Sequence, residues 1–239
     1  MPDPVHLRVR PEDIAELVVT SGDPARTEQL ARMLSESRLV NTNRGLITYS
    51  GYYRKRRVTV STHGMGGPSA SIVFEELRMM GAKVIVRLGT SGGLVHELRV
   101  GDFVVPTGAA YPKGSLSSYG LDGAPPAVPD LGLQKKIVER CISEGVMFKS
   151  GLVFSSDAFY PEDRSSIDDW IKRGAVSVEM ECATLFTLGR LRGFRSASLL
   201  IVSNSKVRKE DRGPATAERL SPYVEKGGRI VLDSMVEGA

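Results

Sequence analysis

Glycine and arginine residues follow one apolar run of this 239-residue chain in a spacing that suits a small anion. Gly22 ends the run, and Arg26 comes four residues later, where a helix is expected to begin. Backbone N–H groups at a glycine and at a helix N-terminus can approach an anion, and a guanidinium one turn into the helix can donate to the same oxygens. Because Gly-Asp-Pro is also a common turn, this segment alone leaves an anion site and a plain turn open.

Arg87 is a charged residue within an otherwise apolar run, residues 84–89. Burying a guanidinium without a partner is costly, so Arg87 needs either a carboxylate or a bound anion beside it. Thr90 follows closely and could add a hydroxyl and a backbone N–H to the same site. The pattern leaves an internal salt bridge and an anion site as alternatives.

Two glutamates, Glu179 and Glu181, could bind the hydroxyls of a sugar. They stand where a helix is expected to start, and acidic residues there often only complement the helix dipole. Met180 separates them and apolar residues follow, so a carboxylate at the mouth of an apolar pocket is the other interpretation. Phe159 and Tyr160 are likewise interpreted either as core aromatics or as a face on which a base stacks.

Apolar runs and helical spacing predict the elements that position these residues. Strands are expected at residues 17–21, 46–53, 58–62, 84–89, 147–154 and 197–202, with another beginning at Phe103. Helices are expected at residues 25–34, 69–80, 131–144, 165–172, 179–191 and 215–236. Strands that alternate with helices are typical of an α/β fold with a parallel or mixed sheet between helices. Ligands of such sheets bind at the carboxyl ends of the strands, here residues 22–26, 63–68, 87–93, 155–160 and 203–206.

Two stretches are expected to be irregular or exposed. The segment 111–129, rich in Gly, Ser and Pro, predicts a long loop, and residues 90–93 predict a glycine-containing turn. The basic cluster 54–57 lies between two strand-like runs and predicts a solvated hairpin turn.

The composition is that of a soluble globular protein, with 41% hydrophobic and 25% charged residues. Neither a membrane span nor a signal peptide is evident, which predicts a cytoplasmic protein. Cys141 and Cys182 suggest neither a disulfide nor a metal site and are expected to be small buried hydrophobes. The net charge of +4 is dispersed, with few aromatics near it, so binding to nucleic acid is not favoured.

Six segments taken together resemble the nucleoside phosphorylase superfamily of hexameric purine nucleoside phosphorylases, uridine phosphorylases and methylthioadenosine phosphorylases. The resemblance runs from about Pro4 to Arg219. It rests on residues 22–26, 43–45, 63–66, 87–92, 154–160 and 178–181 in that order. It implies one domain over residues 1–239 with a three-layer α/β/α fold and a central mixed sheet.

The resemblance also implies roles for matched residues. Phosphate would be bound by Gly22, Arg26, Arg87 and Thr90, together with Arg44 reaching across from a neighbouring subunit. The nucleoside would be bound by His6, also from the neighbour, and by Met65, Phe159, Val178, Glu179, Met180, Glu181, Ser203 and Asn204. Asn204, supported by Arg219, would act on the base, and Arg87 on the phosphate during catalysis.

The implied reaction is phosphorolysis of purine nucleosides to the free base and ribose 1-phosphate, with 5′-methylthioadenosine a further candidate substrate. Inorganic phosphate is the co-substrate, and no metal or organic cofactor is expected. Residues borrowed from a neighbour imply a homo-oligomer, at least a dimer, and the family's usual assembly is a hexamer built as a trimer of dimers. The expected partners are small molecules only, with neither nucleic acid nor membrane.

One departure from the family leaves the base open. The bacterial hexameric purine enzymes have an aspartate where this chain has Asn204, and an amide can donate a hydrogen bond but not a proton. Uridine phosphorylases read uracil with a Gln-x-Arg element, whereas this chain has Glu162 and Arg164 after Pro161, so purines are favoured over uridine. A hydrolytic nucleosidase and a non-catalytic nucleoside-binding protein are the more distant alternatives.

Overall fold

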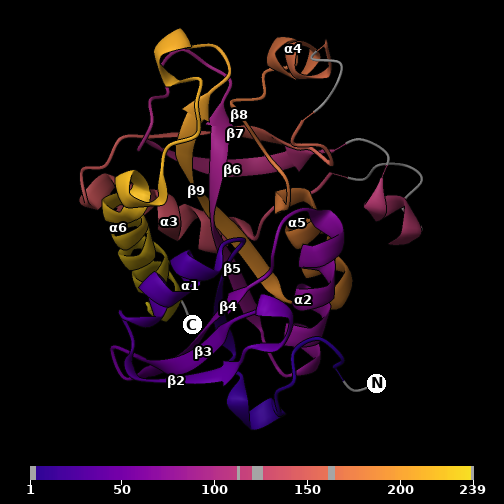
Figure 1. Ribbon diagram of the computed structural model, residues 1–239, viewed down its shortest axis with the longest axis vertical. Coiled ribbons are helices and arrows are strands. Elements are labelled where there is room, and N and C mark those ends of the chain that lie inside the picture. The colour runs from indigo at the N-terminus through magenta and orange to yellow at the C-terminus, as the bar shows by residue number, and fades with distance from the viewer. Residues whose placement is uncertain (1–3, 112–113, 120–125, 161–164, 238–239) are drawn as a thin grey trace.

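The computed structural model describes residues 4–111, 114–119, 126–160 and 165–237 (Figure 1). Its strands are β1 (Leu17–Ser21), β2 (Ser35–Asn41), β3 (Thr48–Tyr53), β4 (Arg56–Thr62), β5 (Val84–Gly93), β6 (Phe103–Ala110), β7 (Phe148–Ser155), β8 (Ser177–Glu179) and β9 (Arg195–Ser205). Its α-helices are α1 (Pro24–Ala31), α2 (Gly67–Met79), α3 (Leu131–Ser143), α4 (Ser165–Lys172), α5 (Cys182–Arg192) and α6 (Ala217–Val236). Short 3-10 helices are η1 (Pro11–Asp13), η2 (Asn43–Gly45), η3 (Ser115–Tyr119) and η4 (Lys209–Asp211).

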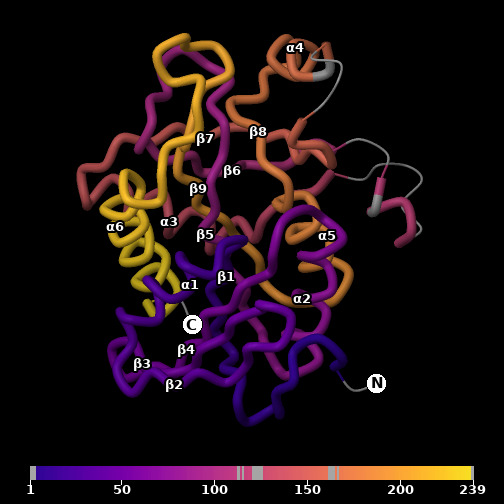
Figure 2. The backbone as a smooth tube through the Cα atoms, in the orientation of Figure 1, coloured from indigo at the N-terminus to yellow at the C-terminus, as the bar shows by residue number. Residues whose placement is uncertain are grey.

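The strands of the described residues form one mixed sheet in the order β2-β3-β4-β1-β5-β8-β7-β6-β9. β1 is parallel to both β4 and β5, whereas β3 is antiparallel to β2 and β4. β5 also pairs with β9 in parallel, so β5, β8, β7, β6 and β9 close into a ring. The antiparallel strands β2 and β3 lie at the opposite end of the molecule from α4 (Figure 2).

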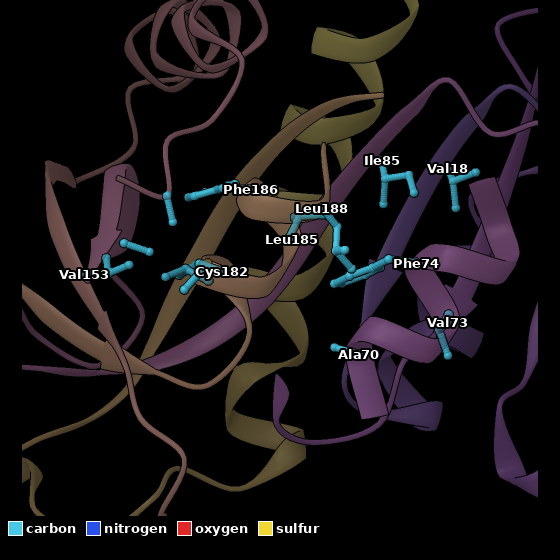
Figure 3. Packing of buried hydrophobic residues seen from close by; sticks show 14 of the residues in the cluster. Val18, Ala70, Val73, Phe74, Ile85, Val153, Cys182, Leu185, Phe186 and Leu188 are labelled. Carbon is cyan, nitrogen blue, oxygen red and sulfur yellow. The ribbon is translucent and has the colours of Figure 1, made fainter. Parts of the chain in front are cut away.

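Helices cover both faces of the sheet, because successive side chains of a strand point to opposite faces. Val18 and Ile85 pack in one core with Phe74 of α2 and Phe186 of α5 (Figure 3). The neighbouring strand residues Leu17, Val19, Val84 and Val86 pack in a second core with residues of α1, α3 and α6. The α/β fold with helices on either side of a mixed sheet is therefore confirmed.

The sequence-based elements are mostly confirmed, with differences concentrated where glycine or polar residues sit inside strands. Residues 90–93 do not form the expected turn, because β5 continues to Gly93 and pairs there with Ser205 of β9. Glu179 ends strand β8, so the expected helix over 179–191 begins only at Cys182. β2 was not expected, since its sequence is mostly polar and its residues are largely exposed at the sheet edge.

Other expectations concern the surface and the cysteines. The basic cluster does form the β3–β4 hairpin turn, where Arg54 and Lys55 take left-handed φ values of 45° and 65°. Cys141 and Cys182 are free and buried, as expected. Part of the expected loop 111–129 lies outside the described residues; within the rest, η3 forms and Ala127 pairs with Ala109. No helix in the described ranges is long and apolar enough to cross a membrane.

Candidate active site

A cavity of about 640 Å³ lies at the carboxyl ends of β1, β4, β5 and β9. This is the edge of the sheet at which ligands were expected from the sequence. Residues predicted to bind phosphate or nucleoside make up much of its lining, namely Gly22, Arg26, Arg44, Met65, Arg87, Thr90, Phe159, Val178, Glu179, Met180, Glu181, Ser203 and Asn204. Of the predicted site residues, only His6 and Arg219 are outside this lining.

At one end of the cavity, the β1–α1 junction brings backbone and guanidinium together. Gly22 stands so close to the β4–α2 segment that a Cβ there would lie 2.9 Å from the carbonyl oxygen of Gly64. Asp23 caps α1, since its Oδ1 accepts the N–H of Ala25 at 2.7 Å. Burial lowers the pKa of Arg26 to about 10, with Asp23 opposing that effect, so Arg26 is still a cation at neutral pH. The segment forms the expected turn and also lines the cavity, so anion binding there stays a prediction.

Arg87 lies at the floor of the same end, buried in the middle of β5. Its Nη2 hydrogen-bonds to Oε2 of Glu181 and lies 3.6 Å from Oε2 of Glu179. Burial by itself would lower the pKa of Arg87, but the nearby carboxylates outweigh it and raise the pKa. The internal salt bridge is thus present. Yet among the described residues neither Nε nor Nη1 of Arg87 has a hydrogen-bond partner, so a residue of the cavity lining keeps two nitrogen donors that an oxyanion could use.

Glu181 is the N-cap residue of α5 and lines the cavity. Its Oε1 accepts the backbone N–H of Gly66 at 2.6 Å, and its Oε2 accepts from Arg87. Burial alone would raise the pKa of this carboxyl, but the charge of Arg87, His63 and the hydrogen bonds from Gly66 and Arg87 together outweigh burial, so the pKa is lowered and Glu181 is ionised. An ionised carboxylate accepts hydrogen bonds, as vicinal hydroxyls require.

The carboxylate of Glu179 is held by hydrogen bonds within the protein. Its carboxylate accepts the hydroxyl of Ser155 and the N–H groups of Glu181 and Cys182, the latter two at 2.8 and 2.9 Å. It therefore caps the start of α5 from the end of β8. Glu179 also lines the cavity, and its contact with a base stays a prediction.

The other end of the cavity has aromatic and amide groups suited to a base. Phe159 and Tyr160 are 54% and 89% exposed, so the core interpretation of this pair is wrong. Phe159 lines the cavity. Asn204 is buried near the end of β9, and its Nδ2 donates to the carbonyl of Arg212 at 3.4 Å. The hydroxyl of Ser203 donates to the carbonyl of Ser91 at 3.3 Å.

Arg44, His6 and Arg219 need separate comment, because two of them were expected to serve a neighbouring subunit and one to support Asn204. Arg44, which has a left-handed φ of 55° in η2, lines this chain's own cavity, and its contribution to a neighbouring subunit stays a prediction. His6 lies outside the lining, with its Nδ1 2.7 Å from Oε1 of Glu76. Arg219 is exposed on the first turn of α6 and lies 4.0 Å from Asp211, away from Asn204's cavity.

Residues without a predicted role also contribute. Ser91, Gly92, Ile167 and Lys206 line the cavity. Lys206 lies in the segment 203–206 that the strand-end rule singled out, so the signal was present although no role was attached to it. His63, in the segment 63–68 that was predicted only to follow a strand, is fully buried against Phe74, and no residue pattern indicated this burial.

The chain matches the phosphorylase superfamily over residues 16–232. A guanosine phosphorylase from Halorubrum lacusprofundi is 33% identical, over 96% of this chain and 97% of its own. A uridine phosphorylase from Treponema pallidum is 34% identical, over 85% of this chain and 83% of its own. The crystal structure of a purine nucleoside phosphorylase from Toxoplasma gondii in complex with immucillin-H resembles this one with a TM-score of 0.89 at 29% identity, covering 98% of this chain and 95% of that one.

The fold, the lining of the cavity and the sequence comparisons all indicate the same protein family. This chain belongs to the phosphorylase superfamily. The fold that the resemblance implied is confirmed over nearly the whole chain.

Proposed function

We propose that this protein is a pentosyltransferase that cleaves purine nucleosides with inorganic phosphate, giving the free base and ribose 1-phosphate. The proposal is supported most directly by one observation: Arg26, Arg87 and Glu181 line a single cavity. Guanidinium groups suit a phosphate, and the carboxylate suits the sugar hydroxyls. Purine and guanosine phosphorylases among the similar proteins support the choice of substrate.

The chemistry follows from this inventory. Phosphate is a modest nucleophile, so holding it beside the anomeric carbon supplies much of the rate increase. The C1′–N bond breaks while a phosphate oxygen bonds to C1′, and the positive charge that develops on the sugar is stabilised by the phosphate dianion. The electron pair of the broken bond goes to the base, whose polar edge would face Asn204. No step in this scheme draws on a metal or an organic cofactor.

Uridine phosphorolysis is the second candidate, because a uridine phosphorylase is also among the similar proteins. The residues that bear on it, 161–164, lie outside the described residues. A hydrolytic nucleosidase would not require arginines around an anion, so Arg26 and Arg87 favour the phosphorylase. A non-catalytic nucleoside-binding protein is the remaining alternative.

One panel separates these functions. Adenosine, inosine, guanosine, 5′-methylthioadenosine and uridine are each incubated with the full-length protein, with and without phosphate, and base and ribose 1-phosphate are quantified. Phosphate-dependent release from the purine nucleosides is expected. Equal release without phosphate would identify a nucleosidase, fastest release from uridine a uridine phosphorylase, and binding without turnover a binding protein.

The proposed assembly is a homo-oligomer, at least a dimer, with a trimer of dimers as the full form. His6 is held near η2, because Asn43 Nδ2 donates to the His6 carbonyl at 2.9 Å. One surface corner therefore carries His6 beside the Arg44 segment and would present both to a neighbour. Light scattering should give a multiple of the 25.9 kDa chain. A fully active monomer would contradict the proposed sharing of residues. A cytoplasmic location stays a prediction.

A further inference from the structure

The buried carboxylate of Glu76 on α2 holds the stretch of chain that carries His6. Its Oε1 accepts the backbone N–H groups of Val5 and His6, each at 3.0 Å, and its Oε2 accepts that of Leu7 at 2.6 Å. Oε1 also lies 2.7 Å from Nδ1 of the His6 imidazole. One side chain of α2 therefore orders residues 5–7 and the imidazole ring together.

Glu76 is ionised in this cluster. Burial by itself would raise the pKa of Glu76, but the hydrogen bonds from Leu7, from the His6 imidazole and from the backbone of Val5 and His6 outweigh burial, so the pKa is lowered. An ionised carboxylate has acceptors and no donor. Nδ1 of His6 must therefore carry the hydrogen of the bond to Glu76, and in the neutral ring Nε2 is left as an acceptor.

The backbone around His6 is also held from the opposite side. Nδ2 of Asn43 donates to the His6 carbonyl at 2.9 Å, and the N–H of Arg8 donates to Oδ1 of Asn41 at 3.0 Å. Asn41 ends β2, and Asn43 begins η2, which carries Arg44 of the cavity lining. The imidazole is thus fixed between α2 and the segment that brings Arg44 to the cavity.

This imidazole lies at the surface with apolar side chains beside it. Within the described part of the chain, the bond to Glu76 is the one hydrogen bond that the His6 ring makes, and the His6 side chain is partly exposed. Val5 and Ile72 are exposed, and Ile72 lies one helical turn before Glu76 on α2. Exposed apolar side chains beside a half-buried imidazole suit contact with a second copy of this chain, as the proposed assembly requires.

We propose that Glu76 is a positioning residue that holds His6 in the Nδ1–H tautomer, so that Nε2 accepts the 5′-hydroxyl of a nucleoside bound by a neighbouring chain. The inference rests on the proposed function, in which His6 is presented to a neighbour and Glu181 binds the vicinal hydroxyls. The ribose of a nucleoside has one further hydroxyl, at C5′. That hydroxyl can donate a hydrogen bond to Nε2.

This arrangement selects nucleosides by the group at C5′. A hydroxyl donates to an acceptor nitrogen, whereas a fluorine atom or a thioether sulfur has no hydrogen to donate. A nucleoside without the hydroxyl leaves Nε2 without its bond, which should lower kcat/KM about tenfold. 5′-Methylthioadenosine should accordingly be a poorer substrate than adenosine.

The test compares inosine with 5′-fluoro-5′-deoxyinosine, whose fluorine is close to a hydroxyl in size. The parent enzyme should prefer inosine about tenfold in kcat/KM. In Glu76→Gln the amide can donate to Nδ1, which moves the ring hydrogen to Nε2, so this preference should fall severalfold. Glu76→Asp keeps a carboxylate and should keep part of the preference. Glu75→Gln is the matched control and should keep all of it, because the Glu75 carboxylate pairs with Arg192 instead.

A second measurement reports the tautomer directly and does not depend on turnover. The chain has three histidines, so the nitrogen-15 NMR signals of ring-labelled protein can be assigned with the help of His6→Gln. At about pH 8, where an ordinary histidine is neutral, the parent should carry the His6 hydrogen on Nδ1, and Glu76→Gln should carry it on Nε2. An Nε2–H tautomer in the parent would overturn the proposal.

The outcomes distinguish this proposal from the proposed function. If the parent enzyme releases no base from any purine nucleoside with phosphate, the proposed function fails, whatever the tautomer of His6. If the parent is active but shows no preference for inosine over the fluoro analogue, the role of Glu76 alone is overturned. Equal losses on both nucleosides in Glu76→Gln would also overturn it, since a residue that only supports the fold would act on both alike.

Discussion

The guanidinium of Arg87 hydrogen-bonds to the carboxylate of Glu181, so one buried ion pair joins the proposed phosphate site to the proposed ribose site. Neither residue is limited to this ion pair. Arg87 has two further nitrogen atoms without a hydrogen-bond partner among the described residues, and Glu181 also accepts the backbone N–H of Gly66. We therefore expect a change at either residue to act on both substrates. Arg26, which forms no such salt bridge within the described part of the chain, is expected to affect phosphate alone.

Replacing Arg26 and Arg87 one at a time by alanine should distinguish an effect on phosphate use from an effect on stability. Arg26→Ala should raise the KM for phosphate about tenfold or more, because a charge-assisted hydrogen bond is lost, with little change in stability. Arg87→Ala should impair phosphate use at least as much and also destabilise the fold by about 3 kcal/mol, since Glu181 is left buried and unpaired. Steady-state kinetics and urea unfolding measure both. Unchanged phosphate kinetics in either variant would contradict the phosphate site.

Glu181→Gln should weaken nucleoside use while largely keeping the backbone contact to Gly66. An amide oxygen can still accept that N–H at Oε1, but the charge that holds sugar hydroxyls and Arg87 is gone. We expect kcat/KM for nucleoside to fall about tenfold or more. Glu139→Gln, an exposed position on α3, is the control. Parental kinetics in the Glu181 variant would remove this residue from the ribose site.

The strand-end rule located the cavity from sequence because it depends only on the alternation of strands and helices. The residues at those ends, such as Gly22 and Arg26, were therefore found without coordinates. The pairing of strands that are distant in the chain could not be predicted from the sequence. The continuation of β5 through residues 90–93 depends on its partner β9, and the position of Glu179 in β8 depends on pairing with both β5 and β7.

The sequence also could not predict which side chains contact one another. Arg87 was known to need an anion or a carboxylate, but only the fold shows that Glu181 is that carboxylate. The burial of His63 follows from the packing of α2 against the end of β4, which no local pattern encodes. The resemblance to a family implied that Arg44 serves a neighbour, and only the fold shows that it also lines this chain's own cavity.

Asn204→Asp should introduce a pH dependence into base release. A protonated aspartic acid can donate to the departing base, but the ionised form cannot and would repel an anion. The kcat/KM for inosine should therefore fall as pH rises through the pKa of the new carboxyl, whereas the parent enzyme lacks that descending limb. A pH–rate profile from 5 to 8.5 on both proteins decides this. Identical profiles and identical base preference would argue against Asn204 as a base reader.

His63 should make stability sensitive to mild acid. Burial lowers the pKa of His63 from 6.5 to about 4, with Glu181 opposing and Arg87 and Arg26 reinforcing the shift. The unfolded chain then binds a proton that the folded chain refuses, so the contribution is complete above pH 6.5 and is lost as pH falls toward 4. Relative to His63→Gln, the parent should lose about 2 to 3 kcal/mol more across this interval.

Urea unfolding of both proteins at several pH values between 4.5 and 7 measures that difference. Carboxylates with lowered pKa values, such as Asp13 and Glu76, also cost stability in acid, but they do so equally in both proteins. The difference between the two curves therefore isolates His63. Parallel curves would mean that the ring is already protonated, or hydrated, in the folded protein.

Gly89→Ala should displace Arg87 without removing its charge. A Cβ at position 89 would lie 1.7 Å from Nη1 and 2.3 Å from Cζ of Arg87, so the guanidinium cannot keep its place. Because a misplaced positioning group costs up to about a hundredfold in rate, phosphate-dependent turnover should fall by more than about tenfold. Gly132→Ala at the start of α3, whose nearest neighbour would be 3.6 Å away, is the matched control. If Gly89→Ala kept the parental KM for phosphate, the position of the Arg87 guanidinium beside Gly89 would not matter for phosphate binding.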